Sequence, residues 1–314
     1  MVLTSMRRMA RAGRRFGPTW RYIFNLAPTL SYKLKRPSIS GEAARILTDL
    51  NRDGMAITSA QALLGAAPCC REIYEAVEEM QRSMSNRIAS ARAEANEWGT
   101  IGEKSFLLEY LGRYPTLDPN DIFGRFALQK PILQIANAYL GMYTRLRYYN
   151  IWHTFASQGQ ARESQLWHRD REDRYILKMF LYLSDVDEGA GPFTYATGSH
   201  LKGRMRREPA YFLEGGVKRS DDSQMTEAIP QSRWRKAVGP KGTIVFADTH
   251  GYHKGGLARE RDRIIYTCMF TSPASESREF LKRPGEIPRP ASLEHAFALA
   301  APKGGAWLSW KPSL

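Results

Sequence analysis

The sequence predicts an α+β fold with a double-stranded β-helix core (a jelly-roll or cupin-like core) and N-terminal helices packed on one face. Three observations predict it. Helical spacing of apolar residues dominates residues 41–145, short β-branched or aromatic runs dominate residues 146–275, and Gly, Pro, Asp or Ser bound those runs. Helices followed by a series of strands are typical of chains in which helices cover one side of a β-core.

The size of the chain suits one large domain, expected over residues 41–314, with an appended arm at residues 1–40. Of its 314 residues 43% are hydrophobic, which is enough for a sizeable core. Two of the three cysteines are adjacent (Cys69 and Cys70), so we expect no disulfide framework and a reducing compartment, such as the cytoplasm. No run of about 18 apolar residues predicts a transmembrane helix.

The helical part of the chain has clear start and stop signals. Gly54 ends the first helix, residues 55–58 suit a short strand, and Pro131 marks a break or restart within the last helix. The helices are expected at residues 41–54, 71–98 and 121–141.

The strand-rich part follows from about residue 146. Its runs are short and end at turn-forming residues, as strands do. Residues 201–241 look like an insert between strands, and residues 281–314 contain five prolines and are expected to be irregular. The strands are expected at residues 147–155, 175–186, 191–197, 242–248 and 263–270.

The net charge of +14 is concentrated in two segments. Residues 1–41 contain nine Lys or Arg and no acidic residue, and residues 201–241 contain ten basic and five acidic residues. For the arm at residues 1–40, the alternatives are a solvated, partly disordered tail, an organellar transit peptide, or a segment that contacts anionic lipid as a peripheral membrane anchor. Nucleic acid is not an expected partner, because no nucleic-acid motif follows.

A candidate metal site comes from two segments that lie far apart in the sequence. His168 and Asp170 are two positions apart, so in an extended chain both side chains point to the same side. His253 follows the hydrophobic run 242–248 and can supply a third ligand. Two His and one carboxylate on one face of a metal leave the opposite positions open, which suits non-haem Fe(II).

Four features occur in order along the second half of the chain. They are WHRD at 167–170, LYLSDVDEGAGPFTYATGSHLKG at 181–203, Gly242 and Phe246 spaced before His253, and Arg263 ten positions after His253. With these features, residues 147–272 resemble the phytanoyl-CoA dioxygenase family of Fe(II)/2-oxoglutarate-dependent oxygenases.

The resemblance implies a jelly-roll fold, Fe(II) held by His168, Asp170 and His253, and 2-oxoglutarate and O2 as co-substrates. It also implies that Arg263 binds the distal carboxylate of 2-oxoglutarate, for which a guanidinium offers a planar two-point contact. In related halogenases a non-carboxylate residue replaces the ligand at Asp170. The carboxylate here therefore favours hydroxylation, or desaturation, over halogenation.

Some assignments have competitors. His250 competes with His253 for the third ligand, and Arg259 and Arg261 compete with Arg263 for the anchor. The spacing from Gly242 in the family motif favours His253 over His250, and its position at the start of a predicted strand favours Arg263 over Arg259 and Arg261. Three further histidines are expected to be structural rather than ligands: His153, His200 and His295.

Further candidate pocket residues lie near the metal motif in the sequence. Lys178, Phe180 and Tyr182 alternate on one strand face and are expected to line the pocket, although the two aromatic residues suit a core equally well. Asn150 and Lys178 are candidates to contact 2-oxoglutarate. Trp167, beside the first ligand, either shapes the substrate pocket or packs in the core.

The basic insert at 201–241 suggests a substrate class. We expect it to flank the active site and to select an anionic small molecule, an acyl-carrier-linked acid or a lipid-linked substrate, with Arg204, Arg206 and Arg207 as contacts. The alternative is a solvated loop. For the whole chain, the alternatives to an oxygenase are a non-catalytic jelly-roll binding module and a cupin-like metal enzyme that does not use 2-oxoglutarate.

Overall fold

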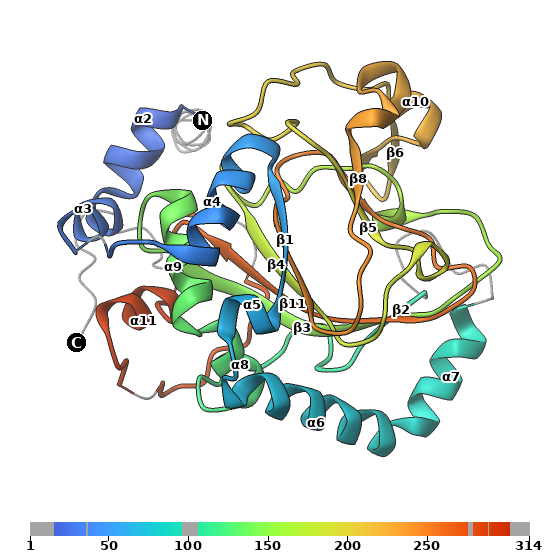
Figure 1. The fold of residues 1–314 in the computed structure, drawn as a ribbon, viewed down its shortest axis with the longest axis horizontal. Coiled ribbons are helices and arrows are strands. Elements are labelled where there is room, and N and C mark those ends of the chain that lie inside the picture. Colours follow the sequence, from blue (N-terminus) through green and yellow to red (C-terminus); the bar gives the residue numbers. More distant parts are fainter. Residues whose placement is uncertain (1–15, 36, 96–105, 276–278, 288, 302–314) are drawn as a thin grey trace, which may run out of the picture.

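The core of the protein consists of two antiparallel sheets (Figure 1). The structure, a computed structural model, describes residues 16–35, 37–95, 106–275, 279–287 and 289–301. The larger sheet has the order β1-β9-β4-β11-β3-β2 and the smaller one the order β10-β5-β8. The larger sheet contains β1 (Met55–Ser59), β2 (Leu107–Glu109), β3 (Arg145–Thr154), β4 (Leu177–Tyr182), β9 (Thr243–Asp248) and β11 (Arg263–Thr271). The smaller sheet contains β5 (Phe193–Ala196), β8 (Trp234–Lys236) and β10 (His253–Gly255).

Strand β4 shows how the sequence sorts its side chains between the two faces of the larger sheet. Met179 and Leu181 join the core beneath the helices. Phe180 and Tyr182 join a second core between the sheets, where they meet Phe193 of β5. Because successive strand residues point to opposite faces, this alternation builds both cores from one hydrophobic run. The jelly-roll core expected from the sequence is therefore confirmed.

Helices cover the outer face of the larger sheet (Figure 1). Pro131 stands in the first turn of α9 and so restarts the helix as expected, because its missing N–H has no helical partner there. The segment expected as one helix from residue 71 is divided at Met84, which has a non-helical backbone. The helices are α4 (Gly41–Asp53), α5 (Ala60–Leu64), α6 (Pro68–Ser83), α7 (Ser85–Ala95), α8 (Ile122–Ala127) and α9 (Lys130–Leu140).

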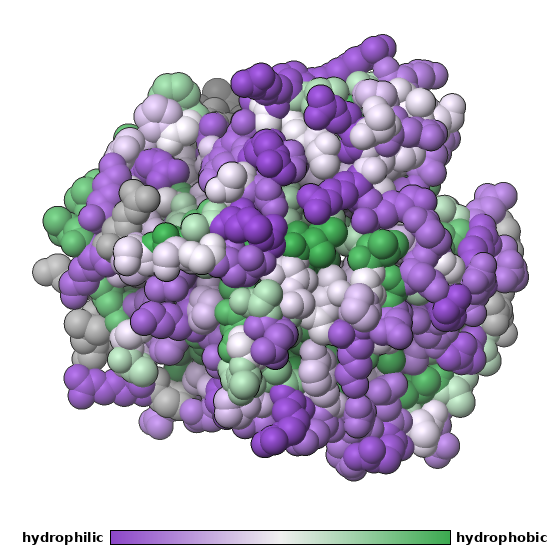
Figure 2. Space-filling model, viewed as in Figure 1, coloured by the Kyte–Doolittle hydropathy of each residue, from purple (hydrophilic) through white to green (hydrophobic). Residues whose placement is uncertain are grey.

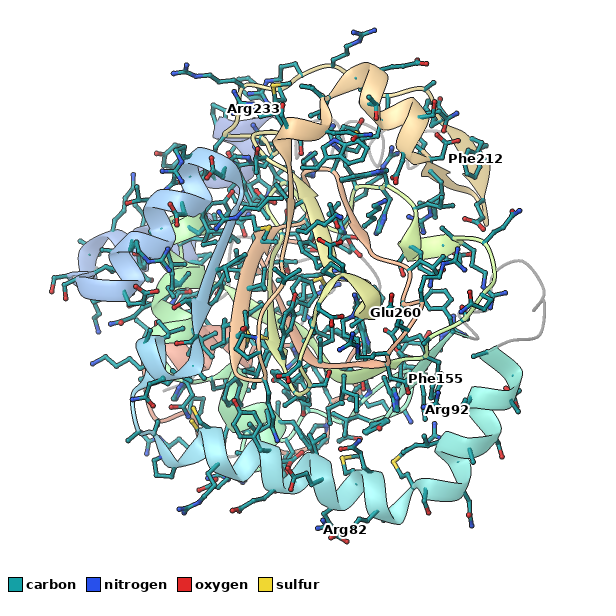
Figure 3. All side chains as sticks on the ribbon, turned by 45° about the vertical axis from the view of Figure 1, so that its right-hand side comes forward. Arg82, Arg92, Phe155, Phe212, Arg233 and Glu260 are labelled. Atoms are coloured by element: carbon teal, nitrogen blue, oxygen red, sulfur yellow. The ribbon has the colours of Figure 1, made fainter. Side chains whose placement is uncertain are left out.

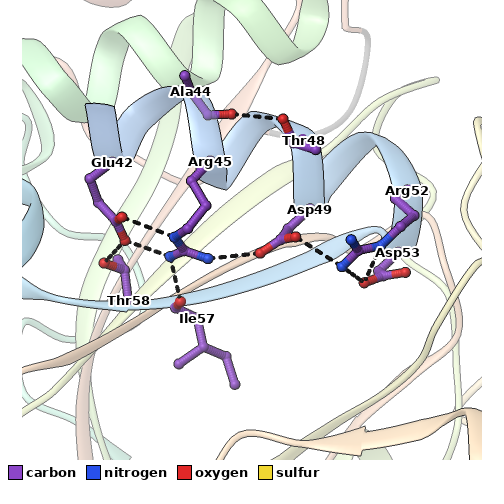
Figure 4. A network of polar contacts seen from close by, with 9 residues as sticks. All are labelled: Glu42, Ala44, Arg45, Thr48, Asp49, Arg52, Asp53, Ile57 and Thr58. Carbon is purple, nitrogen blue, oxygen red and sulfur yellow. Dashed lines mark hydrogen bonds and ion pairs between the residues drawn. The ribbon is translucent and has the colours of Figure 1, made fainter. Parts of the chain in front are cut away.

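A polar network fixes α4 against β1 (Figure 4). Arg45 contacts Glu42 at 2.5 Å and Asp49 at 2.7 Å, and it donates to the carbonyl of Ile57 on β1 at 2.8 Å. Gly54 ends the helix in a left-handed conformation (φ +83°), as the sequence predicted. The helix and the strand therefore form one rigid unit at the edge of the sheet.

Residues 16–35 are helical and lie against the body of the protein, which differs from the expectation of an appended arm. They form α2 (Gly17–Thr19), a π-helical turn (Trp20–Phe24) and α3 (Leu26–Lys35). Trp20 is 2% exposed, and its Nε1 donates to Asp173 at 2.8 Å. This buried aromatic residue explains why the segment docks. Residues 1–15 of the expected arm lie outside the described residues.

The basic insert is only in part a loop. It contributes β8 to the smaller sheet and contains α10 (Asp222–Ala228). It also forms a hairpin of β6 (Phe212–Glu214) and β7 (Val217–Arg219), and Figure 3 shows Phe212 at the outer edge of the molecule. Short strands with many charges did not stand out in the sequence, so no strand was expected within the insert.

The C-terminal region is less irregular than its prolines suggested, because it contains α11 (Leu293–Ala298). Residues 302–314 of that region lie outside the described residues. No helix within the described ranges has the length and apolar character needed to cross a bilayer.

Candidate metal centre

The three residues predicted as metal ligands lie together between the two sheets. His168 pairs with His253 as an isolated antiparallel bridge, with two N–H···O bonds of 3.0 Å. The amide of Asp170 donates to the carbonyl of Thr249 at 2.9 Å, which fixes the third side chain beside the first two. One potential ligand atom from each residue lies within 4.8 Å of the other two. No other such group of His, Cys, Asp or Glu occurs among the residues that the structure describes.

Backbone carbonyls orient both imidazole rings. Nδ1 of His168 lies 2.8 Å from the carbonyl of Leu166, and Nδ1 of His253 lies 3.0 Å from the carbonyl of Gly251. A carbonyl can only accept, so each Nδ1 carries the proton and each Nε2 keeps a free lone pair. Metal-binding histidines are held in this way by the hydrogen bond of their other nitrogen.

The protonation of the three side chains also suits a metal. Burial lowers the pKa of His168 well below its ordinary value, and burial lowers the pKa of His253 to about 4. Burial alone would raise the pKa of Asp170, but the adjacent Lys178 ammonium holds that pKa below its ordinary value. At neutral pH the site therefore offers two neutral nitrogens and one carboxylate, which is the donor set that non-haem Fe(II) takes.

Two cavities adjoin at the triad. One of about 880 Å³ contains all three candidate ligands, and one of about 670 Å³ contains His168 and Asp170. The residues from His168 to Glu172 line both. The larger cavity lies over the inner face of the larger sheet and includes Phe180 and Tyr182. A metal at the triad would therefore face open space on more than one side.

Arg263 lines the larger cavity at the start of β11 and is 7% exposed. Its Nε and Nη1 have no hydrogen-bond partner among the described residues. Burial lowers its pKa, and no carboxylate counteracts that effect. Because arginine keeps its proton in proteins, Arg263 is a buried cation that has no carboxylate partner among the described residues.

The competing residues lie elsewhere. Arg259 donates to the carbonyls of Ser157 and Gly159 at 3.2 and 2.7 Å. Arg261 pairs with Asp187 at 2.8 Å on the surface. His250 lines the smaller cavity but is not part of the ligand group. Of these three residues and Arg263, only Arg263 is a buried cation that faces the triad cavity.

The remaining histidines have hydrogen bonds that suit structural roles. His153 contacts Asp262 at 2.6 Å and the Tyr110 hydroxyl at 2.8 Å. Figure 3 shows Arg92 of α7 beside Phe155 in the same region. His200 lies 3.3 Å from the carbonyl of Asn51, and His295 lies 3.2 Å from the carbonyl of Leu128.

Asn150 does not have the place that the sequence suggested. Its Oδ1 accepts from the amides of Leu111 and Ile151, and its Nδ2 donates to the carbonyl of Gly112. It is fully buried and lines neither cavity. The segment that follows β2 therefore uses the hydrogen-bonding groups of Asn150, which was expected to contact 2-oxoglutarate. The sequence did not predict β2 as a strand.

Lys178, Phe180 and Tyr182 do line the larger cavity. Lys178 Nζ lies 2.6 Å from Asp170 Oδ2, so this cation pairs with a candidate ligand. The Tyr182 hydroxyl donates to the carbonyl of Ala237 at 2.5 Å. Trp167 lines the smaller cavity and donates from Nε1 to Asp222 at 2.7 Å.

Within the insert, the cavity is reached by different basic residues from those expected. Arg204, Arg206 and Arg207 are exposed and line neither cavity. Arg219 instead lines the larger cavity at 5% exposure, and Lys218 lines the smaller one. In strand β7 the successive residues Lys218 and Arg219 point to different cavities. The sequence of charges alone does not indicate which of these residues point inward.

Strand pairing places Arg219 beside the ligands. The amides and carbonyls of Ser220 and Trp167 pair at 3.0 Å, so the preceding Arg219 stands opposite His168. His168 in turn stands opposite His253. Neighbouring residues across antiparallel strands point to the same face, so all three side chains share one wall of the cavity.

Comparison with solved structures identifies the same fold. EctD from S. alaskensis with bound Fe superposes with a TM-score of 0.51 at 16% sequence identity, over 79% of this chain and 85% of that one. EctD with 2-oxoglutarate and 5-hydroxyectoine gives a TM-score of 0.51 at 15% identity, over 83% and 93% of the two chains. At this identity the likeness establishes the fold alone.

The sequence comparisons give no match. No protein-family model matches the chain, and no curated protein matches it.

Proposed function

We propose that this protein is an Fe(II)- and 2-oxoglutarate-dependent dioxygenase that hydroxylates an unactivated C–H bond of an anionic substrate. The ligand geometry of His168, Asp170 and His253 supports the metal, and the fold is shared with EctD, whose solved structures contain Fe in one case and 2-oxoglutarate in another. The motifs of residues 147–272 support the finer proposal that the chain is of the phytanoyl-CoA dioxygenase type.

One observation carries the proposal: the buried guanidinium of Arg263, without a carboxylate partner among the described residues, in the cavity of a His–Asp–His cluster. Burial of an unpaired cation destabilises a folded protein unless a bound anion pairs with it. A dicarboxylate that reaches the metal at one end would place its other carboxylate against this cation. A metal enzyme that does not use 2-oxoglutarate has no need of the cation.

Each residue of the site has its own role in the proposed reaction. His168, Asp170 and His253 would hold the metal, and Arg263 would bind the distal carboxylate of 2-oxoglutarate through a two-point contact. Phe180, with the other aromatic residues of the larger cavity, would exclude water from the reacting centre. Fe(II) and 2-oxoglutarate, when bound, would supply the oxidation of the C–H bond with O2 as the oxidant and with succinate and CO2 as co-products.

Arg219 supports an anionic substrate. Its guanidinium is the second buried one on the wall of the larger cavity, and its Nε and Nη1 have no hydrogen-bond partner among the described residues. Its Nη2 lies 3.2 Å from Glu163 Oε2, so part of the donor fork remains available. A carboxylate or phosphate of the substrate is the group that such a fork binds.

A thermal-shift experiment tests the cofactor assignment. Mn(II) should raise the Tm of the wild-type protein, and 2-oxoglutarate should raise it further only when the metal is present. Arg263→Gln should keep the metal increment and lose the 2-oxoglutarate increment, while Asp170→Ala should lose both. The matched control Arg259→Gln changes an arginine outside the cavity and should behave as the wild type. An Arg263→Gln protein that still responds to 2-oxoglutarate would contradict the assignment.

A further inference from the structure

The helical segment at residues 16–35 leaves its aliphatic side chains on the outside. Ile23, Leu26, Leu30 and Leu34 are 55, 38, 46 and 85% exposed. Leu26, Leu30 and Leu34 are spaced four residues apart, which places them along one side of α3, and Ile23 lies in the preceding π-helical turn. In Figure 2 a group of green, hydrophobic atoms lies at the left edge of the molecule, where Figure 1 places α3.

The opposite side of the same segment is held to the body by polar contacts. Asn25 and Thr29 are fully buried, and Asn25 Oδ1 accepts from the amide of Ala274 at 3.1 Å. Arg21 donates to the carbonyls of Leu140 and Gly141, which end α9. Trp20 and Tyr32 are buried as well, so aromatic and polar contacts together fix the segment while its aliphatic residues stay outside the core. The segment is fixed in place, and its apolar side has been left facing outward.

The segment at residues 16–35 contains more than half of the exposed large hydrophobic residues among those described. Of the eleven exposed large hydrophobic residues in the described part of the chain, six lie between Phe16 and Leu34. Single exposed apolar residues are normal, but a contiguous group marks a surface that contacts another phase or molecule.

The charge around this side has one sign. Within residues 16–35 the charged residues are Arg21, Lys33 and Lys35, and no acidic residue is present. Residues 1–15 add five arginines and no acidic residue in sequence. Aliphatic side chains in a segment whose only charges are cations match the chemistry of an anionic bilayer surface, with acyl chains below phosphate groups. We propose that the outward side of residues 16–35 docks on an anionic lipid membrane, with Ile23, Leu26, Leu30 and Leu34 inserted at the interface.

The docking surface lies next to the candidate site. Asp173, the partner of Trp20, lines the 670 Å³ cavity together with Arg174 and Ala274. A Cβ on Gly17 would lie 3.2 Å from Arg174 Nη2, so the segment packs directly behind that cavity wall. Docking would therefore bring the rim of the cavity close to the lipid. Entry of a membrane substrate by this route rests on the proposed function, whereas the docking itself does not.

Vesicle sedimentation with the full-length protein tests the proposal. The wild type should bind vesicles of phosphatidylcholine mixed with phosphatidylglycerol and bind phosphatidylcholine vesicles weakly, and added salt should weaken the binding. The double variant Leu30→Gln and Leu34→Gln should bind the anionic vesicles about 10-fold more weakly. Its control, Val238→Gln, changes a residue that is exposed to the same 46% as Leu30 and should bind as the wild type.

A second pair of variants tests the charge without changing the apolar residues. Lys33→Gln with Lys35→Gln should weaken binding about 10-fold, whereas Arg71→Gln with Arg82→Gln on α6 should not. The proposal is overturned if the folded wild type does not sediment with anionic vesicles, or if both pairs of basic variants lose binding equally. It is also overturned if the leucine variant turns a dimer into a monomer while vesicle binding is unchanged, because a second copy would then cover this side. These readouts need no metal or 2-oxoglutarate, so they can fail independently of the proposed function.

Discussion

At the scale of single residues, Arg219 is the side chain whose role the structure changes most. It lies opposite His168 on the wall of the larger cavity, and it pairs with a single carboxylate, Glu163. A buried guanidinium with unused donors is suited to bind an anionic group of a substrate.

Substitution of Arg219 should therefore weaken the binding of anionic ligands. We expect Arg219→Gln to lower the affinity for coenzyme A and for inorganic phosphate about 10-fold or more, because a buried charge contact is lost. Titration followed by tryptophan fluorescence measures both affinities. Arg207→Gln, an exposed arginine of the same insert, is the control and should leave them unchanged. Equal affinities in the wild type and Arg219→Gln, or no binding by either, would count against an anion site here.

Asp248 gives a pH prediction. Its carboxyl is fully buried and accepts from the Tyr139 hydroxyl at 2.6 Å, and burial raises its pKa to about 6. The folded protein holds this proton more tightly than the unfolded chain does, so the free energy of unfolding falls as pH rises from about 4 to about 6. Asp248→Asn removes this dependence. Relative to the wild type, its free energy of unfolding should rise by about 3 kcal/mol between about pH 4 and pH 7, measured by urea denaturation. A constant difference across this range would show that Asp248 does not titrate as described.

At the scale of elements, the junction of α4 and β1 depends on Gly54. Its φ of +83° favours glycine, and a Cβ there would overlap the Tyr195 hydroxyl and lie 2.7 Å from His200 Nδ1. Gly41, at the start of the same helix, also has a positive φ (+58°), but a Cβ there would meet nothing within 4 Å. The two glycines thus separate the cost of the backbone conformation from the cost of crowding.

We expect Gly41→Ala to lower the free energy of unfolding by about 1 kcal/mol and Gly54→Ala to lower it by about 3 kcal/mol. Denaturant unfolding of the two variants beside the wild type measures both values. Equal losses would mean that Tyr195 and His200 move aside without cost.

The elements also explain how much of the fold the sequence predicted. Helix α4 and strands β4, β9 and β11 were predictable, because their apolar residues recur with the helical or strand period. Strands β2, β7 and β8 were not, because each has three residues and is stabilised by a distant partner strand rather than by its own pattern. Tertiary contacts decide such short strands.

The same distinction applies to the candidate site. His168 and Asp170 share a face because of their spacing, and the motifs indicated His253 and Arg263, so the sequence brought these four residues together. Asn150 and Arg219 depend on pairings with segments far away in the sequence, namely the segment around β2 for Asn150 and the segment at Trp167 for Arg219. Asn150 was therefore predicted as a site residue although it lines neither cavity, and Arg219 was not predicted although it lines the larger one.

At the scale of the whole molecule, the candidate site lies between the sheets. His253 comes from the smaller sheet, while Lys178, Tyr182 and Arg263 come from the larger one. The helices cover the outer face of the larger sheet, so its inner face remains available for the cavity (Figure 1). Two sheets that each carry part of a site hold its parts at a fixed distance, which is what a metal and a dicarboxylate require together.

The most direct test of the central claim is an anaerobic titration of the metal-free protein with Fe(II) and 2-oxoglutarate, followed by visible absorption. A weak charge-transfer band should appear in the wild type only when both are present. It should be lost in Asp170→Ala, and admission of O2 should then yield succinate from the wild type. If the folded wild type gives neither a band nor succinate, the oxygenase assignment is contradicted, and the jelly roll would serve as a binding module.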